Sequence, residues 1–205
     1  MRSRILTTVA ELEQFAQQFS SRGNAVSLDY LRYAQVRAFF NAQGTMAAGY
    51  ARNCYRPLRY EGWIPECHRS SIAVLSSEKK LCELTCIWIA ESEGKLSSEK
   101  VYLYSVIDAL RSGAEYVLGG TLSAVVFGIQ TQSLPNLLYS GYTDFFATKK
   151  HCWVYGASRG ELFRKIMTFF PYNMMMSAMG KPVYLNRARA RARQLRMKES
   201  RSSAV

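Results

Sequence analysis

The sequence predicts an α+β fold, in which a mixed, mostly antiparallel central sheet is flanked by helices and followed by a basic C-terminal tail. Three observations support this prediction. Apolar residues recur at helical spacing in residues 6–20, two β-favouring runs surround a turn in residues 36–52, and an apolar strand in 81–90 precedes a helical pattern in 98–112. A content of 48% hydrophobic and 20% charged residues is ordinary for a globular protein. We expect one domain over residues 1–180 and a tail over 181–205.

The first predicted element is an amphipathic helix over residues 6–20. Its apolar positions fall on one face: Val9, Leu12, Phe15, Ala16 and Phe19. The polar residues 20–24, which include Gly23, end the helix.

A β-hairpin is predicted next, because residues 36–40 and 45–52 favour strands and the turn between them runs from Asn41 to Gly44. Residues 53–71 contain Pro57 and Pro65 and are expected to be irregular.

The segment 81–90 reads as a buried strand that carries a single acidic residue, Glu83. Strand alternation places Glu83 on the face of Thr85, Ile87 and Ile89. Residues 98–112 form the next predicted helix, which Gly113 ends.

The second half of the chain has less regular hydrophobic patterns than the first half. Residues 116–129 are rich in β-formers and indicate one or two buried strands, and residues 133–140 indicate a short helix with Pro135 in its first turn. Residues 151–156 indicate a strand, and 160–169 fit either a strand or a helix. Pro171 is expected to break the chain before the methionines at 174–179, which fit core packing, an interface or a wall for an acyl chain.

The basic character of the protein is concentrated in the tail. The chain has 27 Lys and Arg against 15 Asp and Glu, a formal charge of +12, and residues 181–205 carry eight of the basic residues and one acidic residue. Such a tail is either solvated or binds nucleic acid, an acidic partner or an anionic membrane surface.

Cysteine usage and the N-terminus indicate a cytoplasmic protein. The five cysteines are odd in number and lack the spacing of a disulfide framework, and the first residues lack the apolar core of a signal peptide. Cys82 and Cys86 share a strand face roughly 13 Å apart, which is too far for one metal ion. The pairs Cys67-His68 and His151-Cys152 match no strong zinc spacing, so we expect no metal.

Four segments of the chain resemble one known family. They are the hairpin 36–52 with its closing Gly49-Tyr50, the strand 83–90, the helix 98–115, and the segment 134–142. The last segment contains the order Asn136, Tyr139 and Gly141-Tyr142. Together these segments resemble the GNAT (N-acyltransferase) superfamily, and the strand Glu-Leu-Thr-Cys-Ile-Trp-Ile is similar to its acyl-homoserine-lactone-synthase-like branch.

The resemblance implies a GNAT-like acyltransferase domain that moves an acyl group from a thioester donor, acyl-CoA or an acyl-carrier protein, to an amine acceptor. It implies Glu83 as the base, acting directly or through water, and Tyr139 as the acid that returns a proton to the sulfur. It also implies two sets of donor-binding residues: Ile87, Trp88 and Ile89 for the pantetheine arm, and Gly94, Lys95, Ser97 and Ser98 for the phosphates.

Other interpretations of these residues stay open at the level of sequence. Glu83 also fits a solvated or Arg-paired residue at a strand end, and Tyr139 and Tyr142 also fit simple packing. The expected phosphate loop contains one glycine, Gly94, and two acidic residues that would repel a pyrophosphate. The alternative function is therefore a catalytically silent GNAT-like binding or regulatory module, whose basic tail contacts nucleic acid or an acidic partner.

Overall fold

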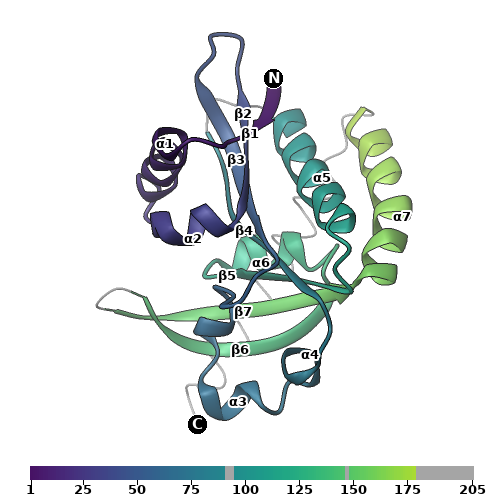
Figure 1. Ribbon diagram of the computed structural model, residues 1–205. Coiled ribbons are helices and arrows are strands. Elements are labelled where there is room, and N and C mark those ends of the chain that lie inside the picture. The colour runs from purple at the N-terminus through teal and green to yellow at the C-terminus, as the bar shows by residue number, and fades with distance from the viewer. Residues whose placement is uncertain (91–94, 146–147, 179–205) are drawn as a thin grey trace, which may run out of the picture. The chain divides into compact units, whose positions relative to one another are not determined.

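The computed structural model describes residues 1–90, 95–145 and 148–178, with side chains except at 95–98 and 169–178 (Figure 1). The chain divides into two compact units. The first comprises Met1–Leu58 and Lys80–Ala114, and the second comprises Arg59–Lys79 and the chain from Glu115 onward. The expected boundary at residue 181 and the basic tail lie outside the described residues, so that division stays a prediction.

The first unit is a four-stranded antiparallel sheet with helices on both faces (Figure 1). Its elements are β1 (Arg2–Ile5), α1 (Val9–Ser20), α2 (Leu28–Tyr33), β2 (Gln35–Phe40), β3 (Met46–Asn53), β4 (Leu81–Ile89) and α5 (Lys95–Arg111). The strand order is β1-β2-β3-β4. The first predicted helix, the hairpin, the strand and the second predicted helix are confirmed as α1, β2–β3, β4 and α5.

Helix α1 begins at a capping box that its sequence encodes. Thr8 Oγ1 accepts a hydrogen bond from the Glu11 N–H at 3.3 Å, and the Glu11 carboxylate accepts one from the Thr8 N–H at 3.1 Å. Hydrogen bonds from Thr7 and Thr8 and the Arg4 guanidinium lower the pKa of Glu11 to about 2, so it is ionised at neutral pH. This reciprocal arrangement satisfies two backbone donors that the first turn would otherwise leave unpaired.

Replacing Thr8 with alanine should lower the free energy of unfolding by about 1 kcal/mol, because the helix loses its N-cap acceptor. Urea denaturation followed by circular dichroism measures this loss. The matched control is Thr7→Ala, since Thr7 contributes only its backbone N–H to the Glu11 carboxylate. Equal losses in the two variants would contradict this role for the Thr8 hydroxyl.

Two buried clusters lie on opposite faces of the first sheet. Phe15 of α1 and Leu31 of α2 pack with Trp88 of β4, whereas Val101 of α5 packs with Phe39 and Tyr50. Helix α1 packs closely on β3 at Gly49. A Cβ added there would come within 2.6 Å of the Phe15 ring, so only glycine leaves room for it. Each face of this sheet is therefore covered by its own helices (Figure 1).

The pairing of β3 with β4 is interrupted by a bulge. Gly49 lies opposite Trp88 and Ala51 lies opposite Thr85, so Tyr50 faces two residues of β4, Cys86 and Ile87. Cys86 has a φ of +53°, the left-handed region that residues with a Cβ rarely adopt. The bulge therefore imposes an unusual backbone conformation in the middle of the strand.

The second unit contains a three-stranded antiparallel sheet in the order β5-β7-β6. Its elements are η1 (Glu61–Trp63), α3 (Glu66–Arg69), α4 (Ala73–Ser76), β5 (Tyr116–Thr121), α6 (Ala124–Gln130), β6 (Asn136–Phe145), β7 (Thr148–Ser158) and α7 (Arg159–Ala178). Helix α6 contacts β5, and α7 contacts β5 and β7. With these elements the predicted α+β class and antiparallel pairing are confirmed.

Three predictions for this unit are wrong in part. Residues 124–130 form a helix rather than a strand, because the Ser123 hydroxyl caps the first turn by accepting from the Val126 N–H at 3.4 Å. Residues 136–140 form the start of β6 rather than a helix, because they pair with β7. Helix α7 continues through Pro171, which was expected to break the chain. Among the described helices, none combines the length and the apolar character needed to cross a bilayer.

Candidate active site

Glu83 lies in the third position of β4 with its side chain fully buried. Its Oε1 accepts a hydrogen bond from the Tyr30 hydroxyl at 2.5 Å. A buried carboxylate needs such a partner, because water no longer solvates it. The interpretation of Glu83 as a solvated residue at a strand end is therefore wrong.

Tyr30 is held in place by the helix that carries it. Helix α2 begins after Ser27, whose hydroxyl accepts a hydrogen bond from the Tyr30 N–H at 3.2 Å. Leu31, the next residue, is fully buried in the cluster on this face of the sheet. The cap and the buried anchor together fix the ring of Tyr30 toward the carboxylate.

Because of the bulge, Glu83 does not lie on the same face of β4 as Ile87 and Ile89. Before the bulge, Glu83 and Thr85 alternate with Leu84 as expected, but the extra residue shifts the alternation beyond Cys86. Ile87 and Ile89 pack against the cluster that contains Val101 of α5, while Glu83 contacts α2 on the other face. The expectation that Glu83, Ile87 and Ile89 share one face is therefore wrong.

The same shift separates two cysteines that were expected on one face. Cys86 packs with Trp88 and Phe15 in the cluster beneath α1. Cys82 instead interacts with Cys54, and each of these thiols is the largest influence on the pKa of the other. Both Cys82 and Cys86 are buried, as expected of structural thiols.

Asn53 lies directly opposite Glu83 in the β3–β4 register and is also buried. Its side-chain oxygen accepts from the Tyr55 N–H and its amide donates to the Tyr55 carbonyl, both at 2.9 Å. This local turn ends β3 beside the carboxylate. The Asn53 side chain is thus held by hydrogen bonds at the end of β3, opposite Glu83 near the start of β4.

The residues expected to bind the donor lie on β4 and α5. Ile87, Trp88 and Ile89 form the end of β4, with Trp88 buried and the two isoleucines half-buried. Lys95 begins α5, and Ser97 and Ser98 lie in its first turn; Gly94 lies outside the described residues. The first turn of a helix has backbone N–H groups without intrahelical partners, which is the kind of group that can bind an anion.

Tyr139 lies on β6 in the second unit and is half-buried. Its ring lies across Gly141, where an added Cβ would come within 2.6 Å of the ring carbon Cζ. Its hydroxyl donates a long hydrogen bond of 3.5 Å to the Tyr142 carbonyl. Partial burial raises the pKa of Tyr139 above its usual value, so the hydroxyl is protonated at neutral pH.

The two cysteine–histidine pairs of the sequence lie on α3 and β7 of the second unit. Burial raises the pKa of the Cys152 thiol to about 11, which keeps it protonated. Cys67 Sγ lies 3.2 Å from His68 Nδ1, and both residues are exposed. Within the residues that the structure describes, no cluster of three or more His, Cys, Asp or Glu side chains could hold a metal ion.

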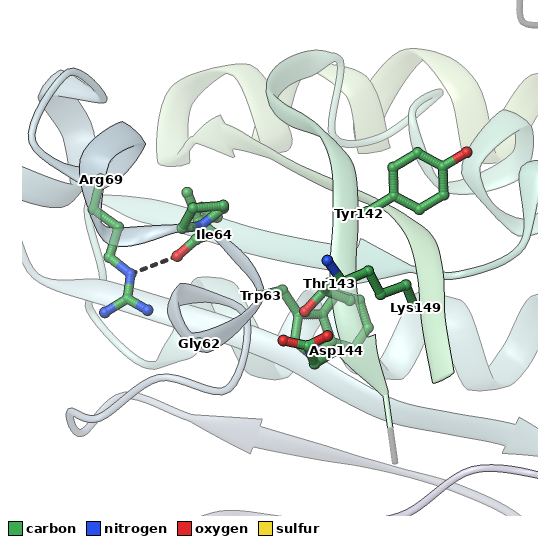
Figure 2. A pocket seen from close by; sticks show the side chains of 9 residues that line it. Gly62, Trp63, Ile64, Arg69, Tyr142, Thr143, Asp144 and Lys149 are labelled. Carbon is green, nitrogen blue, oxygen red and sulfur yellow. Dashed lines mark hydrogen bonds between the residues drawn. The ribbon is translucent and has the colours of Figure 1, made fainter. Parts of the chain in front are cut away.

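The second unit also contains a cavity of about 340 Å³ between η1, α3 and the β6–β7 hairpin (Figure 2). Arg69 lies at its edge, where its Nε donates to the Ile64 carbonyl at 2.7 Å. Asp144 and Lys149, which are opposite each other in register, add one charge of each sign, and Trp63 adds an aromatic surface. The lining therefore contains charged side chains of both signs.

Sequence reasoning singled out Glu83 as a candidate, but it did not predict the positions of Tyr30 and Asn53 beside it or the interaction between Cys54 and Cys82. Tyr30 is 53 residues away from Glu83 in the chain. No local pattern marks such a partner, since the register of β4 and the position of α2 create it. The assigned binding residues 87–89 were located correctly on the strand, although the bulge changes which faces they present.

Comparisons with known proteins support the fold. No protein-family model and no curated protein matches the sequence. FeeM, an N-acyl amino acid synthase from uncultured soil microbes, has a similar structure, with a TM-score of 0.62 at 10% identity over 80% of this chain and 99% of that chain.

Two further structures agree, each with a TM-score of 0.52 at 10% identity. The ribosomal-protein-alanine N-acetyltransferase of Brucella melitensis is matched over 77% of this chain and 99% of that chain. The protein yncA of Salmonella typhimurium, solved with its cofactor acetyl-CoA, is matched over 78% of this chain and 94% of that chain. The fold that the sequence resemblance implied is therefore confirmed, while the narrower acyl-homoserine-lactone-synthase-like branch stays a prediction.

Proposed function

Because the chain has the fold of the GNAT acyltransferases, we propose that it transfers an acyl group from a thioester donor to an amine acceptor. The observation that carries this proposal is Glu83, a fully buried carboxylate three residues before the bulge at Cys86. Buried ionisable groups and left-handed residues are both costly, and they concentrate at functional sites.

Glu83 is proposed as the base. An ammonium acceptor must lose one proton before its nitrogen can attack a thioester carbonyl, and a carboxylate takes that proton directly or through a bound water. The hydrogen bond from the Tyr30 hydroxyl holds Oε1 of this carboxylate. Tyr30 is thus proposed to orient the base.

The end of β4 and the start of α5 are proposed to bind the donor. The pantetheine arm would add to the backbone of Ile87–Ile89 as an extra strand, with its amides bonded to main-chain groups. Gly94, Lys95, Ser97 and Ser98 would bind the phosphates. The start of α5 at Lys95 supports this role, because an anion is stabilised at the positive end of a helix dipole.

Tyr139 is proposed as the acid. Collapse of the tetrahedral intermediate releases a thiolate, which requires a proton from a nearby donor. The hydroxyl of Tyr139 is protonated at neutral pH, as this role requires, although its raised pKa makes it a weaker acid than an ordinary tyrosine.

The donor and acceptor classes are proposed from two structures of similar fold. The acetyl-CoA bound to yncA makes acyl-CoA the first donor to test, and an acyl-carrier protein is the second. The amino acid named for FeeM makes a free amino acid the first acceptor to test.

A thermal-shift series across short-chain and long-chain acyl-CoA species tests the proposal. A donor present at 100 times its Kd should stabilise the protein by about 2.7 kcal/mol and raise its Tm by several degrees. Adenosine 3′,5′-bisphosphate, which lacks the pantetheine arm, is the control and should shift Tm less. A protein that responds to no acyl-CoA and to no acyl-carrier protein would contradict the proposal.

The same failure would favour the alternative function, a silent GNAT-like module whose tail binds nucleic acid or an acidic partner. That alternative predicts binding of RNA or DNA that weakens steeply with salt and is lost when residues 181–205 are removed.

A further inference from the structure

Two cysteines face each other where β3 ends and β4 begins. Cys54 directly follows Asn53 and Cys82 directly precedes Glu83, and Asn53 and Glu83 are opposite each other in the antiparallel register. The next step of that register places Cys54 opposite Cys82. Cys54 and Cys82 are both free thiols.

Each of the two thiols is the largest influence on the pKa of the other. Ser112, which follows α5, donates its hydroxyl to the Ala109 carbonyl at 2.6 Å and also lowers the pKa of Cys54. Cys82 is fully buried, whereas Cys54 is half-buried. A small reagent in solvent therefore reaches Cys54 first and finds Cys82 immediately behind it.

The interaction between the two side chains lowers the pKa of Cys54 and raises that of Cys82. Cys82 lowers the pKa of Cys54 to about 6, helped by Ser112 and the Arg52 guanidinium and opposed by burial and by Glu83. The interaction with Cys54 and burial raise the pKa of Cys82. At neutral pH the accessible sulfur is the nucleophilic one.

We propose that Cys54 and Cys82 are a redox modification site, at which a peroxide converts the two thiols into a cross-strand disulfide. Directly opposed residues of an antiparallel pair have Cα atoms roughly 4.5 or 5.5 Å apart, and disulfides span roughly 4.4 to 6.8 Å. The bond can therefore form without moving either strand far.

The chemistry balances in two steps. The Cys54 thiolate attacks one peroxide oxygen, the O–O bond breaks, and the sulfur becomes a sulfenic acid as the peroxide is reduced to water. The Cys82 sulfur, after losing its proton, then attacks the Cys54 sulfur, the S–S bond forms and the sulfenic oxygen leaves as a second water. In total, two thiols lose two electrons and two protons to one peroxide. Because Cys82 adjoins Glu83, the modification acts on the strand end that carries this carboxylate.

Peptide mapping of the full chain after treatment with hydrogen peroxide tests the proposal. We expect a link between the tryptic peptides that contain Cys54 and Cys82, which dithiothreitol reverses. The Cys54→Ser variant should lose the link, while Cys67→Ser, at an exposed cysteine, should keep it. In Cys82→Ser, Cys54 should accumulate as a sulfenic acid that dimedone traps.

Alkylation by iodoacetamide gives an independent measurement on the unoxidised protein. The rate at Cys54 should rise through a midpoint near pH 6, whereas an ordinary cysteine has its midpoint near pH ~8.5. A peroxide-treated protein in which Cys54 and Cys82 stay unlinked while Cys67 is oxidised would overturn the proposal, as would an alkylation midpoint at Cys54 near that of an ordinary thiol.

Discussion

Replacing Glu83 with glutamine should abolish acyl transfer while leaving the thermal unfolding nearly unchanged. The amide has the same shape as the carboxylate, and its carbonyl oxygen can still accept the hydrogen bond from Tyr30. It cannot take a proton from the acceptor amine, and the loss of a general base typically lowers kcat by roughly 10²- to 10⁴-fold. Thiol release from the donor identified by thermal shift measures the turnover.

The matched control is Glu78→Gln, because Glu78 is an exposed glutamate a few residues before the same strand. It should retain full activity. Tyr30→Phe should show an intermediate loss, because the carboxylate remains but its orienting hydroxyl is absent. Turnover in Glu83→Gln equal to that of the unchanged protein would remove Glu83 from the mechanism.

Replacing Asp108 with alanine should destabilise the protein by about 3–5 kcal/mol, the usual cost of removing one partner of a buried ion pair. The Asp108 carboxylate accepts from Arg37 Nε at 2.8 Å and from the Tyr50 hydroxyl at 2.6 Å. The side chains of Arg37 and Asp108 are only 15% and 6% exposed. Burial is also the main reason that the pKa of Tyr50 is raised, so this hydroxyl remains a donor that needs an acceptor.

The exposed ion pair between Asp29 and Arg32 provides the comparison. Its side chains are 83% and 51% exposed, so Asp29→Ala should cost less than about 1 kcal/mol. Urea denaturation of both variants, followed by fluorescence, gives the two free energies of unfolding. Similar small losses in both would show that the Asp108 network contributes little to stability.

The parts of the fold that the sequence predicted well have strong and local patterns. Residues 6–20 and 98–112 have clear helical spacing, and the hairpin 36–52 has a turn with Asn and Gly between β-favouring runs. The wrong predictions occur where local preference is ambiguous. The β-branched residues of 124–130 favour a strand, but the Ser123 cap starts a helix there. Pro135 is compatible both with the first turn of a helix and with the position just before a strand. The residues that follow it form a strand because they pair with β7.

The candidate site was predictable only in part, for the same reason. Glu83 is noticeable in the sequence because it is the one acidic residue within the apolar run 81–90. Its hydrogen bond from Tyr30 and the interaction between Cys54 and Cys82 depend on tertiary register, which no short window contains. The bulge was not predicted either, because no glycine marks the left-handed position at Cys86.

The extra residue in β4 has a consequence for how this strand tolerates changes in length. Deleting one residue at 86 or 87 would remove the bulge but keep Gly49 opposite Trp88 and Ala51 opposite Thr85, so Glu83 and Trp88 would stay on one face of a regular strand. A change that straightens the strand without shortening it would instead turn one half over, so that either Trp88 leaves the layer beneath α1 or Glu83 leaves the side of the sheet that carries Tyr30. The chemistry assigned to this strand therefore depends on how its residue count matches that of β3 as much as on its side chains.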